Sequence, residues 1–159
     1  RAITARSFEE GIPPRRAAKL ILESGIGLTE RQAGALNRFR DRLQRNVDLG
    51  LSEADVDKRV ARQYQRYLRQ RSETIARTES VRASAEGQQE AWKQAADEGL
   101  IDPSHAVQEW IATDDGIVDV CDDLDGEMAP LGQTFSGGYM APPAHPNCTC
   151  TLALRPGGR

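Results

Sequence analysis

Residues 51–100 read LSEADVDKRVARQYQRYLRQRSETIARTESVRASAEGQQEAWKQAADEGL and contain no proline. Apolar side chains recur in this segment at intervals of three or four residues, the spacing that places them on one face of an α-helix. The positions that show this period are Val56, Val60, Tyr64, Tyr67 and Leu68. The pattern predicts a long helix in the middle of the chain.

Capping signals set the ends of this helix. Ser52 and Asp55 are residue types that satisfy free amides at a helix N-terminus, and Gly99 is typical of the position just past a C-terminus. The segment therefore predicts one helix over residues 53–98, or two helices with a break near residues 71–74.

Two shorter helices are expected upstream, in an N-terminal helical hairpin over residues 1–50. The first begins at Pro14 and stops at Gly25, and the second begins at Thr29 with Gln32 in capping-box spacing. The apolar positions whose spacing indicates these two helices are Ala17, Leu20 and Ile21 for the first, and Ala33, Leu36, Leu43 and Val47 for the second.

The composition of the sequence changes at Pro103, after which prolines and glycines separate short segments. AVQEWIAT (106–113), GIVDVC (116–121) and CTCTLALRP (148–156) each suit a strand. The fold class expected is α+β, with a helical N-terminal half that contains a long helix, followed by a small loop-rich antiparallel β lobe over residues 104–155. Residues 51–159 would then form one module.

Composition points to a component of an assembly. Hydrophobic residues make up 38% of the 159 residues and aromatic residues 5%, which is little for a self-sufficient core. No apolar run approaches the length of a membrane span, and the N-terminus lacks the order of a signal peptide, so we expect a soluble protein of cytoplasmic origin. Because the chain begins at Arg1 and not at methionine, we expect further residues upstream.

The charges are divided unevenly along the chain. Residues 1–100 hold 19 of the 21 basic and 15 of the 24 acidic side chains, whereas residues 101–159 hold 2 and 9. Arginines at helical spacing could follow a phosphate backbone. They could also form a solvated helix face with Asp41, Asp55 and Glu73 as partners, and we favour this second alternative because runs of charge usually form solvated faces. The candidate nucleic-acid-binding residues are Arg38, Arg42, Arg45, Arg59, Arg62, Arg66 and Arg69.

An acidic cluster follows in the second half of the chain. Its members are Asp114, Asp115, Asp119, Asp122, Asp123, Asp125 and Glu127. Such carboxylates could hold Mg²⁺ or Ca²⁺, but the spacing fails the EF-hand pattern. Aspartate also stabilises turns by bonding the backbone two residues on, and we favour that structural use.

Four soft ligands stand in the same half: Cys121, His145, Cys148 and Cys150. Three cysteines and one histidine match a known structural zinc composition, and a small lobe with a weak core would gain most from zinc. In a regular strand, however, the two sulfurs of a C-x-C pair lie roughly 7 Å apart, too far to share one tetrahedral ion. Buried free cysteines also pack as small hydrophobes.

Three blocks of sequence identify a family. ETIARTESVRASAEGQQEAW (73–92), EWIATDDGIVDVCDDLDG (109–126) and a Phe with GGYMAPPAHPNCTC (137–150) resemble the tailed-phage head morphogenesis family, the Mu F-like minor head proteins, over roughly residues 70–154. The positions that match the family motif are Arg77, Thr78, Glu79, Trp110, Asp115, Cys121, Gly126, Phe135, Pro143, His145, Cys148 and Cys150.

Two departures from the family pattern bear on zinc. Val118 stands where the family often has a first cysteine, and Thr149 stands where an arginine is usual between the last two cysteines. The four candidate ligands therefore have no spare, and either zinc is held by these four or the lobe is held by packing alone. We favour the metal-free arrangement.

The resemblance implies a structural virion component and not an enzyme. The expected partners of the chain are the portal protein, the major capsid or scaffolding protein, and double-stranded DNA bound without sequence preference. No membrane partner is expected. The expected location is the phage head interior or portal vertex, with host cytoplasm during assembly. Arg77 or Glu79 could link helix and β lobe, or could form an exposed pair.

Two alternatives stay open. One is a divalent-metal nuclease that uses the acidic cluster and His145. The other is a DNA-binding module outside virions.

Overall fold

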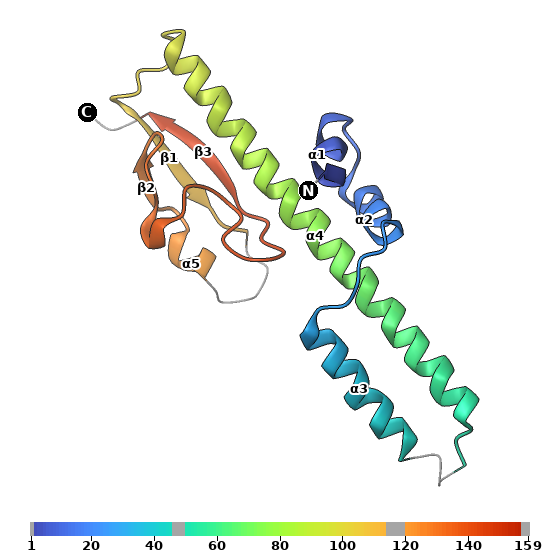
Figure 1. The fold of residues 1–159 in the computed structure, drawn as a ribbon. Coiled ribbons are helices and arrows are strands. Elements are labelled where there is room, and N and C mark those ends of the chain that lie inside the picture. Colours follow the sequence, from blue (N-terminus) through green and yellow to red (C-terminus); the bar gives the residue numbers. More distant parts are fainter. Residues whose placement is uncertain (1, 46–49, 114–119, 157–159) are drawn as a thin grey trace. The chain divides into compact units, whose positions relative to one another are not determined.

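The computed structural model describes residues 2–45, 50–113 and 120–156 (Figure 1). It has the expected α+β fold, with helices first and a small antiparallel sheet last. The elements are α1 (Ala2–Glu9), α2 (Pro14–Glu23), α3 (Glu30–Gln44), α4 (Glu53–Asp97), β1 (Ala106–Ile111), α5 (Val120–Leu124), β2 (Met128–Pro130), the 3₁₀ turn η2 (Ser136–Gly138) and β3 (Thr151–Pro156).

Contacts divide the chain into two compact units. One consists of residues 12–76, and the other of residues 1–11 together with residues 77–159. Helix α4 contributes its first half to one unit and its second half to the other. The domain boundary at residue 50, taken from the sequence, lies inside the first of these units and stays a prediction.

Local signals set the helix ends as the sequence predicts. The Thr29 hydroxyl accepts from the Gln32 amide at 3.2 Å, and the Gln32 side chain accepts from the Thr29 amide at 3.1 Å, which completes the capping box. The Ser52 hydroxyl likewise accepts from the Asp55 amide at 3.2 Å, just before α4. The long helix is unbroken over 45 residues, so the alternative break near residues 71–74 is wrong.

In the unit of residues 12–76, α3 runs beside the first half of α4 (Figure 1). Arg40 pairs with Asp57 at 2.9 Å, and the Gln32 side chain donates to the Tyr67 carbonyl at 3.4 Å. Leu43, Val56 and Leu68 are buried. One of the expected positions differs, because Ala33 is exposed, and Val47 lies outside the described residues.

The sheet in the other unit has the order β2–β1–β3, with both pairs antiparallel. Strand β1 forms where predicted, and its side chains alternate, so that Ala106, Gln108 and Trp110 are buried. Strand β3 begins only at Thr151, three residues later than predicted.

The prediction of a strand over residues 116–121 is wrong for the two residues that the structure describes. Val120 and Cys121, expected in a strand, open the short helix α5, and residues 116–119 lie outside the described part of the chain. The strand that pairs with the other edge of β1 is Met128–Pro130. The turn before it needs Gly126, which has a φ of +74° and donates its amide to the Trp110 carbonyl at 2.9 Å.

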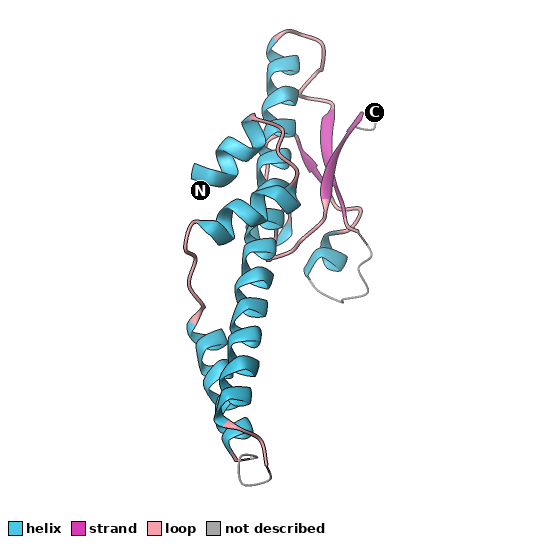
Figure 2. Cartoon of the chain, turned by 90° about the vertical axis from the view of Figure 1, so that its right-hand side faces the viewer, coloured by secondary structure: helices cyan, strands magenta, loops and turns pink. Residues whose placement is uncertain are grey.

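The second half of α4 lies against the sheet (Figure 2). Trp92 packs on the hydrophobic core of the lobe, and the Asn147 amide donates to the Thr78 hydroxyl at 3.1 Å. The expected link through Arg77 or Glu79 is not the one observed. Arg77 is exposed, and Glu79 pairs with Arg82 on its own helix at 2.5 Å, so Thr78 between them makes the connection.

A buried polar chain completes this docking. The Gln89 side-chain amide donates to the Gln108 side-chain oxygen at 3.1 Å and to the Met140 carbonyl at 2.8 Å. Gln108, fully buried in β1, donates in turn to the Gln133 carbonyl at 2.6 Å. Buried polar groups keep their cost low only when they are bonded, so these bonds fix the position of the lobe on α4.

Candidate functional site

The core of the β lobe gathers the predicted motif residues. Trp110 is completely buried, and the Phe135 ring meets it edge-on with centroids 5.4 Å apart. Tyr139 approaches Trp110 in the same manner at 6.3 Å. The buried members of this core are Trp110, Cys121, Leu124, Ala129, Phe135, Cys148, Cys150 and Leu152. All three cysteines of the chain thus lie in one apolar cluster.

The three sulfur atoms lie close together. All lie within 4.8 Å of one another, and the Cys121 and Cys148 sulfurs are 3.7 Å apart. In a strand, Cys148 and Cys150 would lie too far apart to share one metal ion. This objection does not apply, because both cysteines precede β3. Asn147 has a φ of +65°, and the Cys148 amide donates to the His145 carbonyl at 3.2 Å, so the backbone turns here.

Burial makes these thiols hard to ionise. Burial is the main cause that raises the pKa of Cys121 far above its usual range, followed by hydrogen bonds from Cys150 and Cys148. Burial also raises the pKa of Cys150. A thiol nucleophile needs a lowered pKa and access to solvent. The cluster is therefore built for packing or for a soft cation, and not for thiol catalysis.

The raised pKa gives a prediction for alkaline pH. A thiol of ordinary pKa 9.0 ionises in the unfolded chain above that pH, whereas buried Cys121 keeps its proton. Ionisation then stabilises only the unfolded state. The free energy of unfolding of the metal-free, reduced protein should therefore fall by up to about 1.4 kcal/mol per pH unit for each such thiol. Urea unfolding from pH 7 to about 10 measures this loss. Cys121→Ala should show a shallower loss, and an equal slope in both proteins would contradict the assignment.

One of the sulfur–sulfur separations fits the edge of a tetrahedral metal site. With zinc–sulfur bonds of about 2.3 Å, neighbouring sulfurs in a tetrahedron lie about 3.8 Å apart. The Cys121–Cys148 separation of 3.7 Å agrees with that edge. Among the described residues, the three cysteines are the group that could hold a metal, and His145 is not in it. The half-buried His145 ring instead lies 2.9 Å from the Pro146 carbonyl through Nδ1.

Two carboxylates of the acidic cluster accept hydrogen bonds from backbone amides in other segments. The Asp125 carboxylate accepts from the Ala112 amide at 2.8 Å, and the Glu127 carboxylate accepts from the Ser136 amide at 2.7 Å. Asp122 and Asp123 are exposed on α5. Asp114, Asp115 and Asp119 lie outside the described residues, and so does Val118. Asp125 and Glu127 thus have a structural use, but they bond amides 13 and 9 positions away and not the backbone two residues on.

The predicted arginine stripes are exposed on two helices. Arg38 and Arg42 on α3 and Arg45 at its C-cap are exposed, and the Arg42 guanidinium lies 5.9 Å from the Phe39 ring centroid. On α4, no ion pair in the described part of the chain involves the four arginines Arg59, Arg62, Arg66 and Arg69. The expected acidic partner Asp55 bonds Ser52 instead. The α4 stripe is therefore free to meet an anionic partner.

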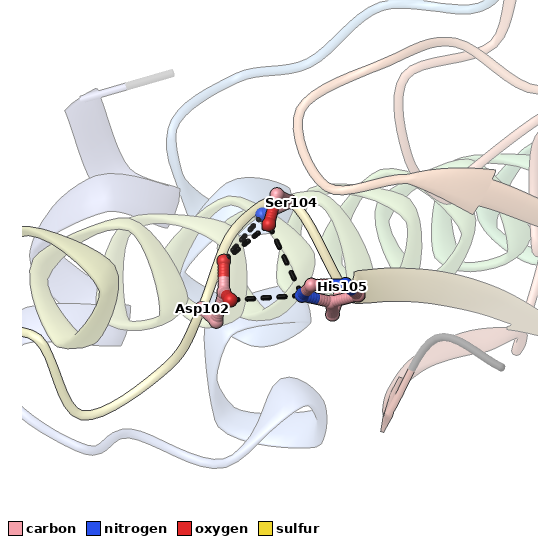
Figure 3. A network of polar contacts seen from close by, with 3 residues as sticks. All are labelled: Asp102, Ser104 and His105. Atoms are coloured by element: carbon pink, nitrogen blue, oxygen red, sulfur yellow. Dashed lines mark hydrogen bonds and ion pairs between the residues drawn. The ribbon is translucent and has the colours of Figure 1, made fainter. Parts of the chain in front are cut away.

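An exposed Asp, Ser and His stand together before β1 (Figure 3). Ser104 donates from its amide and its hydroxyl to Asp102 at 2.9 and 2.6 Å. The hydroxyl bond lowers the pKa of Asp102 most, followed by the bond from His105 and the Ser104 amide bond, and the pKa falls to about 2. Asp102 and Ser104 both contact the same nitrogen, Nδ1 of His105. A catalytic triad uses opposite ring nitrogens for its acid and its serine. The group is a turn that connects α4 to β1.

Sequence reasoning missed the residues that dock the lobe. Gln108 shares the buried phase of β1 with Ala106 and Trp110, so a polar residue at a core position was the available signal. Its partner Gln89 gave no signal, because it lies on a mostly polar helix face. Pro143 is a motif position, and the peptide bond between Pro142 and Pro143, shortly before the last two cysteines, is cis.

None of the helices in the described ranges has the length and apolar character needed to span a bilayer. A protein-family model described as "Phage Mu protein F like protein" matches residues 37–153. The match confirms the resemblance found in the sequence and begins further upstream, within α3. No curated protein and no solved structure matched the chain.

Proposed function

Because the chain belongs to the Phage Mu protein F like family, we propose that it is a minor capsid protein that associates with the portal and with packaged DNA. Family membership indicates a structural role in phage head morphogenesis, and with it a place in the virion. The single observation that carries the proposal is the family match, which covers the long helix and the whole core of the β lobe.

Particle analysis tests this proposal. Mass spectrometry of purified, DNA-filled heads should detect the chain at low copy number, and cross-linking should join it to the portal protein. Heads assembled without the chain should show altered DNA packaging or ejection. Absence of the chain from both empty and filled heads would overturn the proposal and would favour a DNA-binding module outside virions.

Contact with DNA is supported by the exposed arginines on α4, which form no ion pair with the residues that the structure describes. Each phosphate neutralised by a cationic side chain contributes about one to the slope of log affinity against log salt. Arg62→Ala, Arg66→Ala and Arg69→Ala together should therefore weaken binding to any duplex and lower that slope by about 2–3. Gel retardation at a series of salt concentrations measures both effects.

A matched control separates this face from general charge. Arg15, Arg16 and Arg31 are exposed on α2 and α3, so their replacement by alanine removes the same charge elsewhere. The control should leave the salt slope within the error of the wild type. Equal loss in both triple variants would show that net charge, and not the α4 face, holds the DNA. Cleavage of the duplex that EDTA suppresses would instead favour a nuclease.

A structural zinc ion is a second candidate, supported by the three gathered sulfurs. Cys121, Cys148 and Cys150 would supply thiolates, and zinc, when bound, would tie α5 to the segment before β3. Elemental analysis should find one zinc per chain, and added zinc should raise the melting temperature. Cys148→Ser should abolish both effects. If His145→Ala also abolishes them, the histidine is the fourth ligand, whereas a wild type that neither contains nor takes up zinc overturns this candidate.

A further inference from the structure

An acidic groove lies along the last part of α4. Glu86, Glu90 and Asp97 carry three negative charges on one side of the helix, with Lys93 between them. Leu131 and the half-exposed Met140 bring apolar surface from the lobe, and the open volume is about 430 Å³. In the described structure Glu90 meets the Gln94 side chain at 3.4 Å, and no ion pair involves these three carboxylates. The groove therefore favours a cationic partner and repels DNA.

A basic groove lies along the first part of the same helix. Lys58, Arg62, Arg66 and Arg69 line it, with Glu73 at one end, and all five side chains are exposed. Its members are spaced by four, four, three and four residues, so they follow one face of α4. Sequence reasoning identified the arginines of this face but missed Lys58, which stands one helical turn before Arg62.

The two grooves have matching charge spacing. Glu90 and Asp97 follow Glu86 by 4 and 11 residues, and Arg62 and Arg69 follow Lys58 by the same intervals. At a rise of 1.5 Å per residue both patterns span about 16 Å. Two such helix segments laid side by side in the same direction would pair three opposite charges. Lys93 would then face the neutral Gln65, so no like charges would meet.

We propose that copies of this chain associate head to tail, with the basic groove of one copy seated in the acidic groove of the next. The two surfaces differ, so an open row of copies keeps one surface of each kind free, and it either grows into a filament or closes into a ring. This proposal does not rest on the phage role of the chain. It does predict competition with DNA, because Arg62, Arg66 and Arg69 would serve both partners.

Charge reversal tests the pairing in both directions. Glu86→Lys with Glu90→Lys, and Lys58→Glu with Arg62→Glu, should each weaken self-association on the order of 100-fold, since like charges then face one another. Sedimentation velocity of the wild type should show oligomers at about 0.05 M salt that dissociate at about 0.5 M. Glu9→Lys with Glu23→Lys, and Arg15→Glu with Arg16→Glu, reverse matched charges elsewhere and should leave the oligomers intact.

Mixing the two variants gives the decisive result. The reversed acidic groove of the first variant would then meet the reversed basic groove of the second. Oligomers should therefore return in an equimolar mixture and in a chain that carries all four changes. Misfolding of either variant cannot produce this rescue. A wild type that stays monomeric at low salt, oligomers that survive both reversals, or variants that fail to associate when mixed would each overturn the proposal. Excess duplex DNA should dissociate the wild-type oligomers, whereas Glu86→Lys with Glu90→Lys should still bind DNA, which separates this surface from the DNA contact.

Discussion

Replacing Trp110 by alanine should lower the free energy of unfolding of the β lobe by about 3–5 kcal/mol, the usual cost of emptying a large aromatic site in a core. The indole is completely buried, contacts Phe135 and Tyr139 edge-on, and belongs to the same cluster as the cysteines. Because aromatic residues are only 5% of the chain, few other side chains can fill the space. Thermal or urea unfolding, followed by circular dichroism, measures the change.

The conservative change Trp110→Phe is the control. The indole Nε1 is a buried donor that has no hydrogen-bond partner among the described residues, so a phenyl ring there loses no bond and removes an unsatisfied polar group. Its cost should be less than half that of alanine. A phenylalanine variant as unstable as the alanine variant would show that the indole makes a specific polar contact that the packing argument omits.

Replacing Gln108 by leucine should cost about 2–3 kcal/mol although leucine is the more hydrophobic residue. The change leaves the Gln133 carbonyl without its donor and takes one acceptor from the Gln89 amide, and unpaired buried polar groups are expensive. Gln94→Leu, on an exposed part of α4, should change stability by less than about 0.5 kcal/mol. Equilibrium unfolding in urea compares the two variants.

A double-mutant cycle makes the Gln108 prediction specific. If Gln89 and Gln108 act as one network, the combined loss in Gln89→Ala with Gln108→Leu should differ from the sum of the single losses by about 0.5–3 kcal/mol. Strict additivity would mean that the two residues stabilise the lobe independently. In that case the docking of the lobe would rest on Trp92 and Thr78.

Strand assignment shows where sequence patterns fail. The apolar run GIVDVC suits a strand by composition, yet Val120 and Cys121 open α5. The observed strand, Met128–Pro130, is three residues long and ends in a proline, so it carries no periodic signal. It forms because the Gly126 turn brings it to the free edge of β1, and that pairing depends on residues well separated in the chain.

The sequence alone determined the features that depend on neighbours within about four residues. These are the start of α3 at its capping box, the start of α4 after Ser52, the exposed arginine stripe, and the motif blocks that identify the family. Helix period and caps are local, so they can be recognised without the rest of the chain.

Only the tertiary structure decided which distant residues meet. It brought Cys121 to Cys148 across 27 positions, left His145 outside that group, joined Gln89 to Gln108, and set Leu131 and Met140 beside the carboxylates of α4. These contacts depend on the path of long loops, whose closure no local propensity fixes. The residues of the cysteine cluster were therefore predictable from the sequence, but their arrangement was not.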